Sequence, residues 1–145
     1  MAQNHYGKLE KMYLGANVNK QLFDTSTIKI SNGESALSLE VSEKYFHALG
    51  AIHGAVYFKL LDDAAFFAVQ SSVKDVFVLT TSFNINIIRP VNEGKLIAKG
   101  TVRFQSRSFF IAEATLFDQK GKEVAFGTGH FAKSKIPLSD KIGYQ

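Results

Sequence analysis

The spacing of apolar and polar residues changes twice in the first part of the chain. Residues 4–14 place apolar side chains at helical spacing and are followed by Gly15, which predicts a short amphipathic helix. Residues 25–30 and 36–41 then alternate apolar and polar positions, so they predict two strands. Asn32-Gly33 between them has the composition of a tight β-hairpin turn.

After an irregular crossing at residues 42–53, the pattern becomes almost entirely apolar. Residues 54–73 contain no proline and no run of β-branched residues, which predicts one long buried helix. Four alternating segments follow, separated by turn-forming residues, and predict four more strands. They span residues 76–89, 95–105, 108–117 and 123–134. Alternation in the first of these strands, which Pro90 ends, would put six side chains on one face: Phe77, Leu79, Thr81, Phe83, Ile85 and Ile87.

The order of these elements predicts an α+β domain in which antiparallel strands pack around one long helix. At 145 residues the chain has room for a single domain, residues 1–145, whose first 20 residues form an N-terminal helical segment. One helix leaves sheet surface that is too large to remain in water. We therefore expect the chain to self-associate, as a homodimer or a homotetramer.

Composition and charge exclude several functional classes. The absence of cysteine excludes disulfides, zinc–thiolate sites and cysteine nucleophiles, and it fits a reducing, cytoplasmic location. The formal net charge is +4, but the lysines are dispersed, so we expect no nucleic-acid partner. No apolar leader is visible, and Lys59, Asp62 and Asp63 interrupt the most apolar segment, so we expect no membrane partner. The spacing of histidines and carboxylates suggests no metal site.

Two adjacent carboxylates interrupt the predicted long helix, and the helical period gives them different surroundings. Asp63 follows Lys59 by one turn and can pair with it. Asp62 instead has Phe58 and Phe66 one turn away on either side. Because apolar surroundings raise the pKa of a carboxyl group, Asp62 is the candidate base or nucleophile, and a purely structural role in capping backbone donors is the alternative.

Gly54, at the start of the same helix, is the second candidate. The first backbone N–H groups of a helix lack partners within it and carry the positive end of its dipole, and glycine lets a carbonyl oxygen approach them. Gly54 lies roughly 12 Å from Asp62 along the helix axis, at ~1.5 Å per residue. The two groups of one chain would therefore meet only across a long substrate, whereas a dimer could join the donor of one chain to the carboxylate of the other.

Three motifs occur in order along the chain. They are His53-Gly54-Ala55, Leu60-Leu61-Asp62 and Asn84-Ile85-Asn86-Ile87-Ile88-Arg89-Pro90. Their order and spacing resemble those of hotdog-fold acyl-CoA thioesterases of the phenylacetate-pathway (PaaI-like) type, over about residues 25–135. The resemblance implies a curved antiparallel sheet wrapped around the long helix, with two chains joined at their sheet edges.

The resemblance also implies roles for the matched positions. Asp62 corresponds to the acidic catalytic residue, Gly54 to the residue whose N–H polarises the thioester carbonyl, and Thr80 to a hydroxyl that assists the water. His47 stands where the family usually has an asparagine that binds the thioester region or the water, and Ala55 replaces a second glycine. The implied substrate-binding positions are His53, Ala55, Phe58 and Arg107, the last of these against the phosphates of coenzyme A.

The implied function is hydrolysis of an acyl-CoA thioester to a free acid and CoA, which needs no metal or other cofactor. The departures at His47 and Ala55 leave a second possibility, a protein that binds acyl-CoA without turnover. A third is hydration or dehydration of an enoyl thioester, but residues 42–53 lack the proline-rich loop of those relatives. His53 could also serve only to orient its loop, and Phe58 could belong to the core.

Overall fold

The computed structural model describes the backbone from Ala2 to Gln145 and the side chains from Asn4 onward. Met1, which belongs to the expected N-terminal helical segment, lies outside the described residues. The helices are α1 (Ala2–Gly15), α2 (Asn17–Leu22) and α3 (Gly54–Gln70), with short 3-10 turns η1 (Glu43–Tyr45) and η2 (Asp140–Ile142). The strands are β1 (Thr27–Ser31), β2 (Glu34–Glu40), β3 (Val76–Ile87), β4 (Lys95–Gln105), β5 (Phe109–Phe117) and β6 (Glu123–Pro137).

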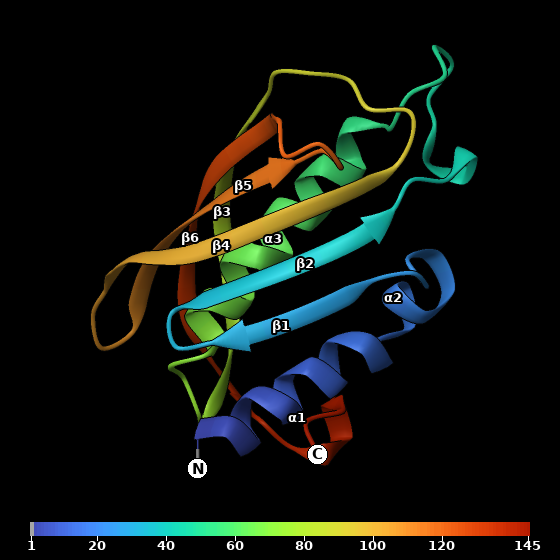
Figure 1. The fold of residues 1–145 in the computed structure, drawn as a ribbon. Helices are drawn as coiled ribbons and strands as arrows, with labels where there is room; N and C mark the ends of the chain where they lie inside the picture. Colours follow the sequence, from blue (N-terminus) through green and yellow to red (C-terminus); the bar gives the residue numbers. More distant parts are fainter. Residues whose placement is uncertain (1) are drawn as a thin grey trace.

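The six strands form one antiparallel sheet in the order β1-β2-β4-β5-β6-β3. The sheet curves around α3, which contacts every strand, so the expected α+β architecture is confirmed (Figure 1). The expected hairpin is also present, because Ser31 pairs with Glu34 and Gly33 has a positive φ of 73°. The sheet begins with β1 and ends with β3, so the outer side of β3 is a free edge in the described part of the chain.

Helix α3 lies very close to the sheet at one point. A Cβ atom on Gly100 of β4 would lie 2.2 Å from the backbone oxygen of Ala64, so only glycine fits there. The Ser35 hydroxyl of β2 donates to the same oxygen at 2.6 Å. These contacts fix the height of the middle turns of α3, which carry the two adjacent carboxylates, above the sheet.

The helix ends earlier than the apolar pattern predicts, at Gln70 instead of Val73. The Gln70 side chain is fully buried, and its amide donates to the backbone oxygens of Val73 and Val76 at 3.0 and 2.9 Å. Its oxygen accepts from the N–H of Val78 at 2.9 Å. The side chain thus pairs backbone groups of the turn that joins α3 to β3, in place of a further helical turn.

Strand β3 does not keep the uninterrupted alternation predicted from its sequence. Register shifts occur between Val76 and Val78 and again between Thr80 and Ser82, where Thr81 is the extra residue. A bulge of this kind reverses which side chains face inward on its two sides. The prediction that Thr81 shares the face of Phe83 is therefore wrong, and it is Thr80 that points toward α3.

The two ends of the chain pack together beside the sheet (Figure 1). The His5 ring of α1 is buried, with Nδ1 2.8 Å from the Tyr144 hydroxyl and Nε2 3.0 Å from the backbone oxygen of Gln70. Because Gln70 O accepts, Nε2 carries the proton and Nδ1 accepts from the tyrosine. The N-terminal helices and the C-terminal turn are thereby held against the far end of α3.

Candidate functional site

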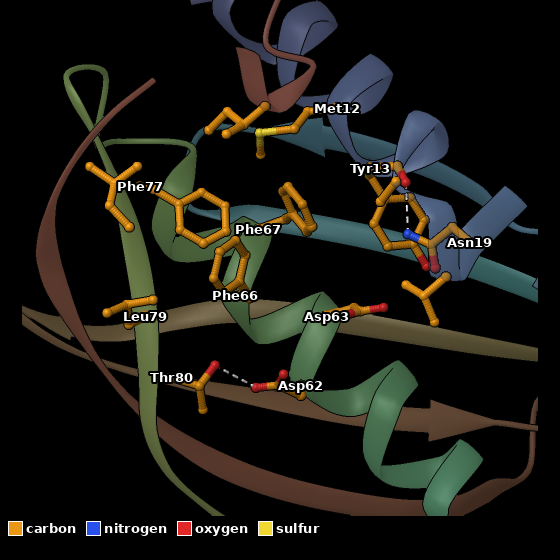
Figure 2. A pocket seen from close by; sticks show the side chains of 14 residues that line it. Met12, Tyr13, Asn19, Asp62, Asp63, Phe66, Phe67, Phe77, Leu79 and Thr80 are labelled. Atoms are coloured by element: carbon orange, nitrogen blue, oxygen red, sulfur yellow. Dashed lines mark hydrogen bonds between the residues drawn. The ribbon is translucent and has the colours of Figure 1, made fainter. Parts of the chain in front are cut away.

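Asp62 lies on the side of α3 that faces β3. Its Oδ1 atom accepts a hydrogen bond of 2.9 Å from the Thr80 hydroxyl, as Figure 2 shows. Burial among apolar groups raises the pKa of Asp62 to about 6, and the hydrogen bond from Thr80 partly opposes this rise. The nearby charge of Asp63 raises the pKa further, whereas Lys59 lowers it. Asp62 is thus ionised at neutral pH and is basic enough to accept a proton from water.

The neighbouring carboxylate is held in a different way, as the helical period predicts. Asp63 pairs with Lys59 one turn earlier, and the two side chains are only 20% and 17% exposed. The Lys59 ammonium group also donates to Asn19 Oδ1 at 2.5 Å and to the Tyr13 hydroxyl at 3.2 Å. Asp63 therefore anchors the N-terminal helices to α3, and its charge is already compensated.

At the start of α3, one backbone donor of the first turn is left available. The His53 ring caps the helix, with Nδ1 accepting from the N–H of Ala55 at 2.9 Å, and the backbone oxygen of His53 accepts from the N–H of Val56 at 2.9 Å. Among the described hydrogen bonds, none uses the N–H of Gly54. This N–H is therefore the donor that a carbonyl oxygen could reach.

His47 lines the same end of the molecule. Its Nδ1 accepts from the N–H of Leu49, two residues later, at 3.1 Å. An asparagine side chain makes the same contact in an Asx turn. Because Nδ1 is the acceptor, the neutral ring carries its proton on Nε2 and presents a single N–H donor. The histidine thus reproduces both the turn and the donor that an asparagine would supply.

The four predicted catalytic residues line two different cavities of the chain. Asp62 and Thr80 line a cavity of about 530 Å³ between α3, β3 and the terminal segments (Figure 2). His47 and Gly54 line another, of about 350 Å³, together with Tyr57 and the residues that follow β3. The structure therefore brings the residues together in pairs but does not unite all four within one chain.

The predicted substrate-binding residues are distributed less compactly. His53 and Ala55 adjoin Gly54, and their hydrogen bond supports the loop-orienting role of His53. Phe58 packs edge-on against Phe83, with ring centroids 5.7 Å apart, and remains 40% exposed. Arg107 is exposed in the turn between β4 and β5 and lines neither of the two cavities.

Sequence reasoning missed part of the larger cavity. Met12, Tyr13, Asn19 and Val18 line it from the N-terminal helices, and Ile136 and Ile142 line it from the C-terminal end. The apolar stripe of residues 4–14 indicates that α1 packs against something, but no local signal identifies the partner surface. Among the described residues, no cluster of three metal-binding side chains occurs, and none of the helices has the length and hydropathy needed to cross a membrane.

Comparison with known proteins identifies the wider family of the fold. The sequence pattern of the thioesterase superfamily matches residues 49–125, just over half of the chain. The E. coli PaaI protein from the phenylacetic acid degradation operon is similar over 95% of this chain and 99% of its own, with a TM-score of 0.82 and 20% identity. Zebrafish thioesterase superfamily member 2 covers 88% of this chain and 96% of its own, with a TM-score of 0.77 and 16% identity.

A thioesterase family protein from Silicibacter pomeroyi also matches 88% of this chain and 98% of its own, with a TM-score of 0.77 and 22% identity. A search of curated proteins found no significant match. The structural similarities confirm the hotdog fold that the motifs led us to expect.

Proposed function

The chain belongs to the thioesterase superfamily, and from this we propose that it hydrolyses acyl-CoA thioesters to a free acid and CoA, in an active site built from two copies of the chain. The observation that carries the proposal is the environment of Asp62. It is an apolar site that raises the pKa of the carboxyl group to about 6, next to a hydroxyl group and in the wall of a cavity.

In the proposed reaction, Asp62 acts as the general base. The Thr80 hydroxyl donates its own proton to Asp62, so its oxygen lone pairs can accept a hydrogen bond from the attacking water. Asp62 removes a proton from this water as the oxygen bonds to the thioester carbon. The N–H of Gly54 holds the negative charge that develops on the carbonyl oxygen. The carbon–sulfur bond then breaks, and the thiolate leaves and takes up the proton.

The free edge of β3 supports the proposal that two copies of the chain pair to form the active site. Large apolar side chains remain exposed along and just beyond this strand, with Leu79 46%, Ile87 50% and Ile88 49% exposed. If two β3 strands pair antiparallel near their middles, the end of one strand that carries Ile87 runs beside the part of the other strand that carries Leu79. Ile87 borders the cavity of Gly54, and Leu79 borders the cavity of Asp62. Such pairing would bring the donor of one copy beside the base of the other.

The direct test measures thiol release from a panel of acyl-CoA esters. The wild-type protein is expected to release CoA, and Asp62→Asn is expected to abolish release while the protein remains folded. Asp75→Asn is the matched control, because Asp75 is 72% exposed and its contact with Lys133 is long, at 3.9 Å. No release from any ester, with binding retained, would refute hydrolysis and favour a ligand-binding protein.

A second experiment removes the proposed carbonyl donor without disturbing the helix. Proline is well tolerated at the first helical position, where Gly54 lies, and it has no N–H. His53 already has φ −64° and ψ 142°, the conformation that a following proline favours. We expect Gly54→Pro to lower kcat by about 10²–10³. Gly54→Ala keeps the N–H, and its Cβ meets only the end of the Ile87 side chain at 3.1 Å, so it serves as the control.

Mixing the two inactive variants then tests the two-chain site. In a mixed dimer of Asp62→Asn with Gly54→Pro, one of the two shared sites would contain neither substitution. Co-expression should therefore restore about a quarter of the wild-type activity, for random pairing into dimers. If each chain carries its own complete site, every site keeps one substitution and co-expression restores nothing.

A further inference from the structure

The cavity beside Asp62 is lined almost entirely by hydrocarbon. From Asp62 and Thr80 it extends past Phe66 and Phe77 toward Met12, which lies beyond the aromatic rings in Figure 2. Along α3 its lining reaches Phe67, about 7.5 Å from Asp62 at about 1.5 Å per residue. Its volume of about 530 Å³ is typical of sites for small molecules. A group bonded to a thioester carbon at Asp62 would enter it directly.

The polar side chains in this wall are already paired with one another. Asp63 and Asn19 both bind the Lys59 ammonium group, and the Asn19 amide donates to the backbone oxygen of Tyr13 at 2.7 Å. A hydroxyl or carboxylate entering the cavity would lose its water and find no unpaired partner in this group. The chemistry of the wall therefore favours an apolar guest.

The far end of the cavity is closed by the two ends of the chain. Met12 of α1 and Ile142 of η2 both line it. The adjoining Gly143 lies beside Met12, and a Cβ at Gly143 would be in ordinary van der Waals contact with the Met12 Cα, at 3.4 Å. The His5–Tyr144 hydrogen bond of 2.8 Å holds the same two segments together. The end wall is therefore a fixed contact between residues at opposite ends of the sequence.

We propose that this cavity receives the acyl group of the substrate, that the acyl group is apolar and either aryl or of medium chain length, and that Ile142 and Val18 set its size limit. This inference rests on the proposed thioesterase function and adds its substrate class. Ile142 forms part of the end wall, and Val18 lines the cavity from α2 while remaining 47% exposed.

Two substitutions change the cavity in opposite directions. Ile142→Ala lengthens it, and Val18→Phe fills it. Leu14→Phe is the matched control for the second, because Leu14 is similarly exposed, at 44%, but does not line the cavity. Values of kcat/KM are measured with butanoyl-, octanoyl-, dodecanoyl-, benzoyl- and succinyl-CoA, so that chain length, an aryl group and a second carboxylate are each represented.

The wild-type protein is expected to prefer octanoyl- or benzoyl-CoA and to reject succinyl-CoA. Ile142→Ala should raise the ratio of dodecanoyl to octanoyl activity by about tenfold, and Val18→Phe should lower the ratio of octanoyl to butanoyl activity by about tenfold. Should Ile142→Ala fail to fold, Val18→Phe against Leu14→Phe decides the question alone.

Three outcomes would overturn the inference, and they are distinguishable. If the wild-type protein hydrolyses esters but Val18→Phe keeps its chain-length ratios, as Leu14→Phe does, the acyl group binds elsewhere and the proposed function stands. If succinyl-CoA is as good a substrate as octanoyl-CoA, the apolar class is wrong. If the wild-type protein hydrolyses no ester, the proposed function fails and this inference fails with it.

Discussion

Replacing Asp62 by asparagine should remove activity and at the same time make the protein more stable at neutral pH. The pKa of Asp62 rises from 3.8 to about 6 on folding, mainly because the carboxyl group leaves water. The folded protein therefore binds this proton more tightly than the unfolded chain does. The contribution of Asp62 to the free energy of unfolding therefore falls as pH increases from about 3.8 to about 6. Above both values this contribution is constant, because neither the folded nor the unfolded state holds the proton.

The size of the effect follows from the two pKa values. A difference of one pKa unit corresponds to about 1.36 kcal/mol, so the rise from 3.8 to about 6 corresponds to about 3 kcal/mol across the whole pH range. Asp62 keeps some access to water, which reduces this to about 2 kcal/mol between pH 4 and pH 7.5. Asparagine has no charge to bury, and its oxygen can still accept from the Thr80 hydroxyl.

The assay is urea denaturation of the wild-type protein, Asp62→Asn and Asp75→Asn at a series of pH values and one protein concentration. The gain in unfolding free energy from Asp62→Asn should grow by about 2 kcal/mol from pH 4 to pH 7.5. The corresponding difference for the exposed Asp75 should stay within about 0.5 kcal/mol. A gain from Asp62→Asn that is the same at every pH would show that burial does not raise the pKa of Asp62 and would remove the basis of its role as a base.

Three further predictions concern other parts of the molecule. The kcat/KM of the wild-type protein should rise with pH through about 6 as Asp62 ionises. In the wild type the hydrogen bond from Thr80 lowers the pKa of Asp62, so Thr80→Val, which removes this bond, should move the rise to higher pH. Thr80→Ser keeps the hydroxyl and should return the rise to its wild-type position. His47→Asn should keep the rate of thiol release within about fivefold of wild type, because the carboxamide can accept from the N–H of Leu49 and donate to the site. A loss of about 10² or more would mean that the imidazole takes part in proton transfer, which asparagine cannot do. Thermal or urea unfolding should show Gly100→Ala to be destabilised by about 3 kcal/mol or more by the clash with Ala64, whereas Gly7→Ala, with open space around it in α1, should gain about 0.5–1 kcal/mol.

Much of the fold could be predicted because it is encoded in local patterns. The apolar period gave α3 and the alternating segments gave the strands, with β4 exact at both ends. The same period separated the paired Asp63 from the desolvated Asp62. Asn32-Gly33 predicted its hairpin turn, because the positive φ adopted by Gly33 suits few other residues.

The features that the sequence did not reveal all depend on contacts between distant segments. The bulge at Thr81 is set by how β3 registers with β6, and it decides that Thr80 faces Asp62. The closure of the cavity by Met12 and Ile142 depends on the meeting of the two ends of the chain.

The sequence by itself thus determined the elements, the hairpin and the chemically unusual carboxylate, since each follows from residues within a turn or two of one another. The resemblance implied Thr80 as the hydroxyl beside that carboxylate, but only the tertiary structure decided that a bulge at Thr81 turns it inward and which segments close the cavity of Asp62. The physical reason is that a periodic pattern records which side of an element is buried. The surface that buries it is chosen by the packing of the whole chain.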